Sequence, residues 1–398
     1  MAQDEHALTR RQFLGAAAVL LGPSAAFLQT SAARFVSTVP LGNPANLPAT
    51  PLERLLGSSL DARLFTDLST LDARAPQTRV IPNDRFYVRT ARPAALPDPR
   101  AWRIPVAGLV EAPSSVTMDD LERNVTTLGP CVMECAGNSD PANFGLMSAA
   151  TWEGVPLTAV LDRVKPASRN ARVLVSGVDD GGPAATSVTS IPGASWIFSR
   201  DDLQRAILAV RMNGAPLPPD HGLPVRLVVP GWYGCACIKW VDRIELAKDD
   251  ATATTQMREF AARTHQPFDS PEGLNALSAG TARARDFSPA VIDTAAMPVR
   301  VEKWIAGGRV EYRIVGIVWG GTKSTNALSI RFRTNGPWAK VDDCPMPASP
   351  LTWSVWTHTW RPSEIGRYQI VLRVDDSSIR TRRLDLFFYV REIDISEV

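Results

Sequence analysis

The sequence contains no Cys-x-x-Cys-His segment and no long basic run, and both absences narrow what the chain can be. A c-type haem needs such an attachment segment, so we expect no haem in this chain. The formal net charge is only +2, which gives no support for nucleic-acid binding. After residue 28 no apolar run approaches the roughly 20 residues that a membrane-spanning helix needs. We therefore expect no membrane span once the first segment is removed.

Cysteine is also scarce, with five residues at positions 131, 135, 235, 237 and 344. An odd number leaves at least one thiol unpaired, ligated to a metal or joined to another chain. The spacings 131/135 and 235/237 do not match those of zinc sites. The pairing of Cys131, Cys235, Cys237 and Cys344 stays open from the sequence.

The N-terminal segment has the pattern of an export signal. Arg10 and Arg11 precede an apolar run over residues 15–28, and small residues follow at 31–33. This is typical of a twin-arginine signal cleaved after Ala33, which predicts a periplasmic or otherwise exported protein. Twin-arginine export carries folded proteins, often with a cofactor already inserted. An N-terminal anchor that is never cleaved is the alternative.

The rest of the composition predicts an α+β protein of two domains. Thirty-two prolines and 26 glycines favour many turns and short strands over a helical bundle. Removal of the signal leaves roughly 360 residues, enough for two domains. We place the signal and a spacer at residues 1–40, a mixed α/β domain at 41–265, a connector at 266–290 and a β domain at 291–398.

Local patterns predict several elements within these domains. Alternation predicts a strand over Arg85–Arg89, and Asp201–Ala209 has a helical pattern. The polar stretch around the connector is expected to be extended. From Val299 onward roughly seven short strands in about 100 residues, the last over Leu384–Val390, predict an immunoglobulin-like sandwich.

The most informative cysteine is Cys135, in the segment Cys-Ala-Gly-Asn at 135–138. Alanine, glycine and asparagine suit a tight turn. A thiol held there, with little side chain around it, can reach a metal or a cofactor, and metal binding would keep it deprotonated. An isolated cysteine is more often a buried structural residue, and this alternative remains open for Cys135 taken alone.

Three side chains that can donate hydrogen bonds lie on either side of two turns rich in glycine and proline. His221 and Arg226 precede an apolar strand at 227–229, and Lys239 follows the next turn. Each residue is unremarkable alone, and a lone histidine is usually structural. Together they could converge on an anion, because the arginine fork matches phosphate geometry.

Four motifs follow one another along the chain. They are Phe86-Tyr87-Val88-Arg89, Glu134-Cys135-Ala136-Gly137-Asn138, Asn213-Gly214 with Asp220-His221-Gly222 and Pro224-Val225-Arg226, and Pro230-Gly231 with Ile238-Lys239-Trp240. In this order they resemble the sulfite oxidase family of molybdopterin-dependent oxidoreductases, of the bacterial, exported, haem-free type. Four ordered motifs are far more specific than any one of them.

The resemblance implies one molybdenum held by a single molybdopterin. Cys135 would ligate the metal and, with Arg89, serve catalysis; a soft thiolate suits such a metal. The residues that would bind the cofactor are Phe86, Arg89, Asp179, His221, Arg226, Cys237, Ile238 and Lys239. Arginine near the open face of the metal would attract an oxyanion.

The resemblance also implies an activity and partners. An oxygen atom from water would be transferred to a small substrate such as sulfite or another sulfur oxide, and the electrons would pass to a separate c-type cytochrome. The C-terminal sandwich would form a homodimer, with a monomeric accessory domain as the alternative. Cys344 could be free or intermolecular.

Three positions depart from the family pattern. Ser139 and Asp140 replace two arginines, and Ser187 stands where sulfite-oxidising relatives have a tyrosine. An acidic Asp140 would repel a dianion, and Tyr233 could be an alternative phenol. The substrate therefore stays open: an oxygen-atom reductase acting on sulfoxides and a cofactor-binding protein without turnover are the two alternatives.

Overall fold

The structure is a computed structural model that describes residues 33–42, 61–91, 98–139, 144–168, 171–178 and 194–398. Four predicted features lie outside these residues: the twin-arginine segment, Asp140, Asp179 and Ser187.

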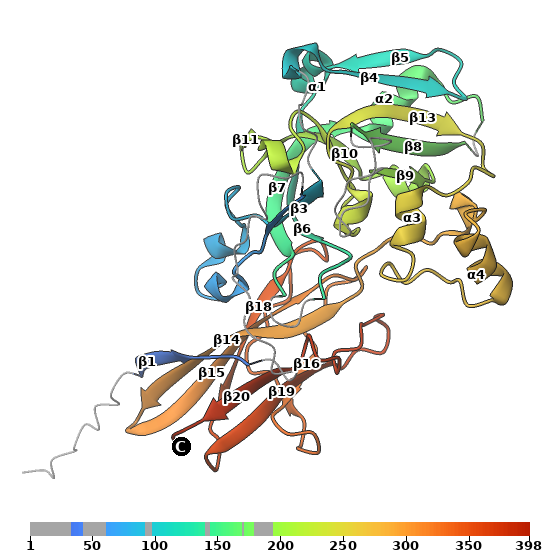
Figure 1. Cartoon of the computed structure of the whole chain (residues 1–398). Coiled ribbons are helices and arrows are strands. Elements are labelled where there is room, and N and C mark those ends of the chain that lie inside the picture. The colour runs from blue at the N-terminus through green and yellow to red at the C-terminus, as the bar shows by residue number, and fades with distance from the viewer. Residues whose placement is uncertain (1–32, 43–60, 92–97, 140–143, 169–170, 179–193) are drawn as a thin grey trace, which may run out of the picture.

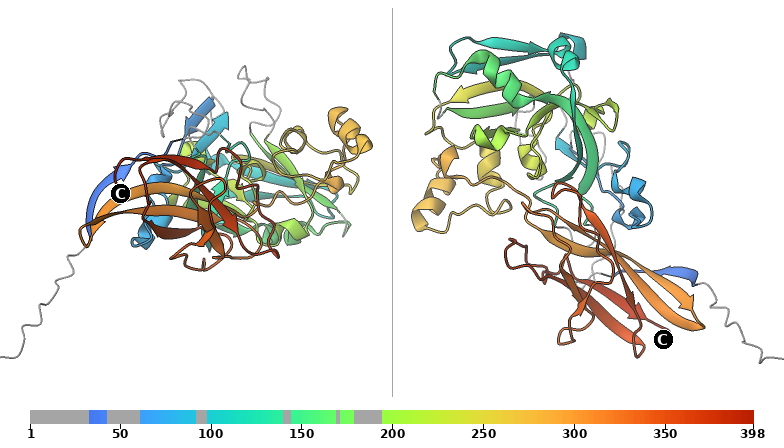
Figure 2. Two further views of the ribbon diagram at one scale, coloured as in Figure 1. Left: turned by 90° about the horizontal axis from the view of Figure 1, so that it is seen from below. Right: turned by 180° about the vertical axis from the view of Figure 1, so that it is seen from behind.

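The chain forms an N-terminal α+β part and a C-terminal β-sandwich, which lie at opposite ends of an elongated molecule (Figure 1). The view from behind in Figure 2 shows the same separation. The predicted α+β class with a C-terminal sandwich is confirmed, while the immunoglobulin-like topology stays a prediction.

The first sheet of the N-terminal part carries the cysteine turn at its edge. Its strand order is β11-β10-β7-β6, and β12 also pairs with β10. The strands are β6 (Thr126–Glu134), β7 (Met147–Pro156), β10 (Ile207–Met212), β11 (Ala215–Pro216) and β12 (Arg226–Val228). Asn213 and Gly214 adopt φ values of 54° and 76° in the β10–β11 hairpin, as a two-residue turn of this kind requires.

The helix predicted over Asp201–Ala209 is wrong. Only a 3-10 turn, η4 (Asp201–Leu203), forms there, and Ile207 already begins β10. Residues 207–209 pair with β7 on one side and with β12 on the other. This two-sided pairing of β-branched and apolar residues outweighs the local helical pattern.

The second sheet has the order β5-β4-β13-β8-β9. Its strands are β4 (Arg103–Gly108), β5 (Ser114–Thr117), β8 (Arg172–Gly177), β9 (Ser195–Phe198) and β13 (Val241–Ala247). Two helices accompany it, α1 (Met118–Arg123) and α2 (Leu157–Val164). Thr117 and Asp120 form a capping box that begins α1.

A two-stranded sheet joins β2 (Asp61–Leu64) to β3 (Val88–Ala91). The strand predicted over Arg85–Arg89 therefore begins late, because Arg85 N–H donates to Pro82 O at 3.0 Å and holds residues 82–85 in a turn. The remaining 3-10 turns are η1 (Leu68–Thr70), η2 (Pro76–Arg79), η3 (Pro99–Ala101), η5 (Pro219–His221), η6 (Gly234–Ala236) and η7 (Ala284–Asp286).

The predicted connector contains helix where an extended chain was expected. Helix α4 (Pro271–Ser278) lies within residues 266–290, and α3 (Thr255–Glu259) precedes it. Ser270 caps α4 by accepting from Gly273 N–H, and Pro271 occupies the first turn. Both residues favour a helix start.

The sandwich consists of two four-stranded sheets, β1-β14-β15-β18 and β17-β16-β19-β20. The strands are β1 (Arg34–Val39), β14 (Ala295–Ala306), β15 (Arg309–Trp319), β16 (Leu328–Arg331), β17 (Ala339–Lys340), β18 (Ser354–Trp360), β19 (Gly366–Val374) and β20 (Arg391–Ile395). Strand β1 comes from the segment predicted as a spacer and pairs with β14 (Figure 1).

The strand predicted over Leu384–Val390 is wrong. The chain there makes turns, in which Tyr389 and Val390 N–H both donate to Leu386 O. Strand β20 begins only at Arg391. These turns place the rings of Phe388 and Tyr389 beside Phe144 of the N-terminal part, at 6.0 and 5.4 Å between centroids.

Direct hydrogen bonds join the two parts. Val132 N–H donates to Leu351 O at 2.7 Å, Ile292 N–H to Gly231 O at 2.9 Å, and the Trp353 indole to Arg79 O at 3.0 Å. One apolar cluster of buried side chains runs through both parts. The sandwich is therefore part of the framework that holds the edge of the first sheet.

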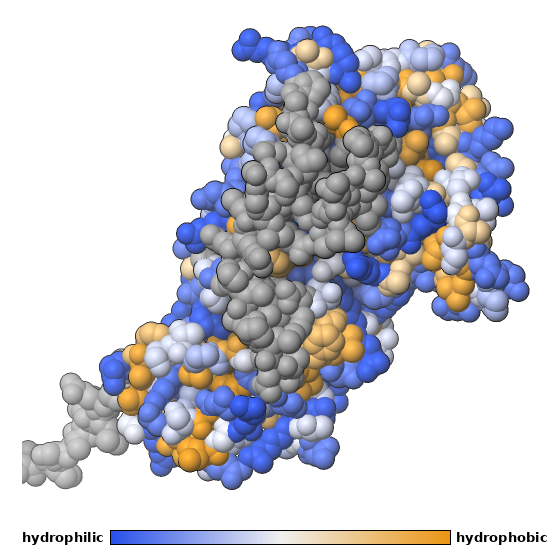
Figure 3. All heavy atoms as spheres, viewed as in Figure 1, coloured by the Kyte–Doolittle hydropathy of each residue, from blue (hydrophilic) through white to orange (hydrophobic). Residues whose placement is uncertain are grey.

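Among the described residues, no helix is both long and apolar enough to cross a membrane. The face seen in Figure 3 is largely hydrophilic, with apolar residues in small groups. The exposed large apolar side chains come from distant parts of the chain: Phe35, Val36, Leu274, Met346, Ile365, Phe387 and Val398.

Gly316 in β15 tests the packing of the sandwich. A Cβ at this position would overlap the buried Trp356 ring and Met297 O. We expect Gly316→Ala to lower the free energy of unfolding by about 1–3 kcal/mol, measured by chemical denaturation. Gly336→Ala, whose Cβ would meet nothing closer than Arg333 O at 3.3 Å, should cost under about 1 kcal/mol. Equal effects of the two substitutions would contradict this packing.

Candidate molybdenum-cofactor site

Cys135 stands at the end of β6, on a turn held by its own backbone. Its N–H donates to Leu146 O at 2.9 Å, and its carbonyl accepts from Asn138 N–H at 2.9 Å. The Asn138 side chain accepts from Leu146 N–H at 3.0 Å. Gly137 N–H points to Cys135 Sγ at 3.4 Å. The predicted tight turn is therefore present and orients the sulfur.

The Cys135 thiol is free and half-buried. Burial raises its pKa, while the guanidinium groups of Arg89 and Arg263 act in the opposite direction. Arg89 lies on β3, so the structure brings together the two residues predicted as catalytic. A half-buried thiol beside two cations is suited to bind a metal as a thiolate.

Arg226 is 3% exposed and has no carboxylate partner among the described residues. Its guanidinium donates to His221 O at 3.2 Å and to Cys237 O at 3.1 Å, and lies 5.0 Å from the Trp152 ring centroid. Its Nε is buried without a partner. Burial lowers the pKa of Arg226, and no carboxylate of the described residues opposes this effect. Such a buried cation is suited to an anionic ligand.

His221 and Lys239 lie beside Arg226. Burial and the charges of Lys239 and Arg226 lower the pKa of His221 to about 3, so its ring is neutral near pH 7. The ring packs edge-on against Phe86 at 5.3 Å, and Lys239 Nζ donates to Asp220 O at 2.7 Å. Gly222, with φ of 109°, allows the close approach of Arg226 and Lys239.

Tyr87 links this cation cluster to Cys135. It is buried and stacks on Phe86 at 5.2 Å. Burial and the nearby Cys135 raise its pKa, while Arg226 acts against them. The predicted residues Phe86, Arg89, Cys135, His221, Arg226 and Lys239 thus form one neighbourhood. Nothing in the four motifs assigned a role to Tyr87, although its position next to Phe86 in the first motif was a signal.

Cys237 and Ile238 take part through their backbone. Cys237 O accepts from Arg226, and Ile238 O accepts from Leu227 N–H at 2.7 Å. Both side chains are buried in the apolar core. Their predicted contact with a cofactor stays a prediction.

A cavity of about 340 Å³ opens beside Cys135, between the two parts of the chain. It is lined by Glu134, Cys135, Ala136, Asn138, Ser139, Tyr233, Arg263, His265, Asp293, Arg380, Thr381, Arg382, Arg383, Leu386, Phe388 and Tyr389. Ser139 therefore faces this space. The residues from 380 onward were missed by the sequence analysis, although three arginines within four positions were a signal.

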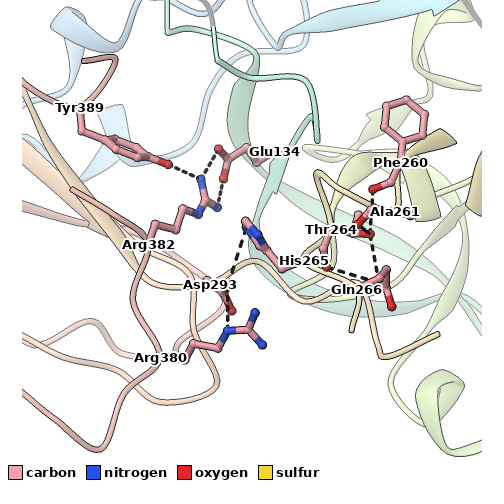
Figure 4. Close-up of polar contacts among 10 residues, drawn as sticks. All are labelled: Glu134, Phe260, Ala261, Thr264, His265, Gln266, Asp293, Arg380, Arg382 and Tyr389. Atoms are coloured by element: carbon pink, nitrogen blue, oxygen red, sulfur yellow. Dashed lines mark hydrogen bonds and ion pairs between the residues drawn. The ribbon is translucent and has the colours of Figure 1, made fainter. Parts of the chain in front are cut away.

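The buried ion pair of Glu134 and Arg382 closes one wall of the cavity (Figure 4). Arg382 donates to the two carboxylate oxygens at 2.8 and 2.7 Å and to the Tyr389 hydroxyl at 2.9 Å. The Trp319 indole donates to the same carboxylate at 2.8 Å. Burial lowers the pKa of Arg382, but the nearby Glu134 carboxylate more than offsets this effect. The pKa of Arg382 therefore lies above its ordinary value.

Two phenols line the cavity. Burial raises the pKa of Tyr389 to about 12 and that of Tyr233 further, so both hydroxyls stay protonated near pH 7. The Arg382 guanidinium lies 5.4 Å from the Tyr233 ring centroid. The structure thus places the phenol proposed from the sequence, Tyr233, beside the cavity and adds a second one, Tyr389.

Comparisons with known proteins identify relatives of this chain. Residues 91–255 match the family model of the oxidoreductase molybdopterin binding domain. Mitochondrial sulfite oxidase of Mus musculus is 27% identical over 321 residues, which cover 75% of this chain and 56% of that protein. NADH nitrate reductase 1 of Nicotiana tabacum is 34% identical over 183 residues, which cover 42% of this chain and 20% of that protein. The chain spans about half the length of the sulfite oxidases that it matches.

A solved structure shares the fold over most of the chain. The crystal structure of the sulfane dehydrogenase SoxCD from Paracoccus pantotrophus aligns with a TM-score of 0.63 and 19% identity, covering 89% of this chain and 92% of that one. Fold, matched domain and site define the class as a molybdenum oxidoreductase with a molybdopterin-type cofactor. The domain match over residues 91–255 and the sulfite oxidase relatives bear out the resemblance to the sulfite oxidase family of molybdopterin-dependent oxidoreductases that the sequence showed.

The Glu134–Arg382 pair provides a test of how the two parts are joined. We expect Arg382→Met to lower the free energy of unfolding by about 3–5 kcal/mol, because it leaves the Glu134 charge buried and unpaired. The double variant Glu134→Gln with Arg382→Met should recover part of this loss. Both can be measured by chemical denaturation.

Arg383→Met is the matched control for this test. Arg383 is exposed and pairs with the exposed Asp385 at 2.7 Å, so its loss should cost at most about 1 kcal/mol. An Arg382→Met effect no larger than that of the control would show that the buried pair does not join the two parts.

Proposed function

We propose that this chain is an exported molybdenum enzyme that transfers an oxygen atom from water to a small sulfur-containing anion, with sulfite as the first substrate. The observation that carries this proposal is a free thiol on a fixed turn, placed between an uncompensated buried arginine and an arginine-lined cavity. For sulfite, the reaction with water yields sulfate, two protons and two electrons. When bound, the molybdenum cofactor supplies the oxygen-atom transfer and accepts the electrons.

The residues around Arg226 fit the anionic end of a single pterin. The Arg226 guanidinium offers fixed donors for which no carboxylate of the described part of the chain competes, and Lys239 adds a second charge. His221 is neutral and keeps its place through Asn83 O at 3.1 Å. Cys135 would provide the thiolate ligand, while Arg89 would stabilise its negative charge.

The cavity side would receive the substrate. An arginine on its lining without a carboxylate partner among the described residues favours an anion, and the buried protonated hydroxyls of Tyr233 and Tyr389 can donate hydrogen bonds. The sequence resemblance supports a separate c-type cytochrome as the acceptor and a homodimer formed through the sandwich. The twin-arginine segment supports export. If it directs export, a variant with Arg10→Lys and Arg11→Lys should remain in the cytoplasm.

A second candidate is an oxygen-atom reductase that acts on a sulfoxide. The cavity favours it in one respect, because Leu386, Phe388 and Tyr389 form an apolar wall. Its volume, about 340 Å³, lies within the range of pockets that hold small organic molecules. Steady-state assays with sulfite and cytochrome c, against sulfoxides and a reduced viologen, separate the two. Turnover of sulfoxides with no sulfite oxidation would overturn the leading proposal.

Cys135→Ser tests the metal ligand. We expect the variant to fold, because serine is close in size, and to lose at least about 100-fold in kcat for want of the thiolate. X-ray absorption should show one molybdenum–sulfur contact fewer. Cys344→Ser, in a half-buried loop of the sandwich, is the control and should keep both properties. Full turnover by Cys135→Ser would remove this residue from the mechanism.

A further inference from the structure

The cavity beside Cys135 contains four arginines, and three of them are paired with carboxylates. Arg382 is held by both oxygens of Glu134, Arg380 lies 3.2 Å from Asp293, and Arg383 lies 2.7 Å from Asp385. A fixed carboxylate partner neutralises the charge of a guanidinium and occupies some of its N–H donors, so the guanidinium attracts a second anion less strongly. These three arginines therefore do not account for anion binding in the cavity.

Arg263 is the fourth, and it has no carboxylate partner among the described residues. Its charge is exposed to the cavity, and its side-chain contact is the Phe260 ring, 5.7 Å from the guanidinium. Ser139, which follows the cysteine turn, has no positive charge. Among the described arginines that line the cavity, Arg263 is thus the one without a carboxylate partner.

The position of Arg263 places it at the cysteine turn. A Cβ built on Gly137 would lie 3.3 Å from an Arg263 terminal nitrogen and 3.7 Å from Cys135 Sγ. The absence of a side chain at Gly137 therefore keeps the space between the guanidinium and the sulfur open.

The backbone around Arg263 is fixed. Its N–H donates to Phe260 O at 3.1 Å, and the Thr264 hydroxyl donates to the same carbonyl at 2.9 Å. The preceding helix α3 is tied to the other cysteine loop, because the Gln256 side chain donates to Cys235 O. The guanidinium thus extends from an anchored turn, so binding an anion there does not require the backbone to be ordered.

We propose that Arg263 is the residue that binds the anionic group of the substrate beside Cys135 and determines the preference for anions. This inference rests on the function proposed above, and it assigns the role to a segment outside the four sequence motifs. The guanidinium offers two parallel donors to an oxyanion, a geometry that lysine cannot supply.

Sulfate, an unreactive dianion, is the probe for this proposal. Calorimetric titration of the holoenzyme at constant ionic strength measures its Kd without turnover, and steady-state assays give KM and kcat for sulfite. We expect Arg263→Gln to raise the sulfate Kd and the sulfite KM about 10- to 100-fold, as for the loss of a charged hydrogen bond. The kcat should change less than about 3-fold and the molybdenum content should stay the same. The sulfate Kd and the sulfite KM of Arg263→Lys should lie between those of the unsubstituted enzyme and those of Arg263→Gln.

Arg383→Gln is the matched comparison, because Arg383 lines the same cavity but is paired with Asp385. We expect its sulfate Kd to change at most about 3-fold. A sulfate Kd that is unchanged in Arg263→Gln, or weakened more by Arg383→Gln, would overturn the proposal. If sulfate binding depends on Arg263 but sulfite is not oxidised, this inference stands while sulfite falls as the substrate.

Discussion

The buried ion pair between Glu134 and Arg382 is the interaction on which the geometry of the site depends. Glu134 is the last residue of β6 and directly precedes Cys135, while Arg382 belongs to the sandwich. A buried pair contributes little net stability compared with apolar packing, but its geometry is strict, because either charge left alone is costly. With the Trp319 indole on the same carboxylate, the pair holds the residue before Cys135 from the opposite part of the chain. The sandwich therefore acts on the cysteine turn, whatever its role in assembly.

The site has two electrostatic sides with different character. Arg226 is buried and has no carboxylate partner among the described residues, and its charge and that of the half-buried Lys239 lower the pKa of the neighbouring His221. Around the cavity, Glu134 and Asp293 are interleaved with the arginines. The first side suits permanent binding of an anion, because the cost of burying its charges is recovered only when the anion is present. The second side is open and mostly compensated, which suits a small anion that enters and leaves.

Local signals in the sequence predicted elements well where the backbone alone decides them. The predicted tight turn at Cys135 forms through its own backbone hydrogen bonds. Asn213-Gly214 forms a tight turn because both residues accept positive φ, and Thr117 begins a helix through its capping box. Predictions failed where distant pairing decides. Residues 207–209 form a strand because two neighbours bond to them, and residues 384–390 form turns because they fill the interface between the two parts. The helix α4 was missed although Ser270 and Pro271 carried a start signal.

The sequence by itself determined the family, the cysteine turn and most of the cation cluster. The motif residues lie within short segments, and their types already specify a thiolate and anion-binding donors. Only the tertiary structure decided which charges are compensated. Glu134 and Arg382 are 248 positions apart, and the contact of Arg263 with the cysteine turn crosses between segments that share no motif. Pairing of this kind depends on how the two parts pack, because a charge is compensated by whatever lies nearest in space.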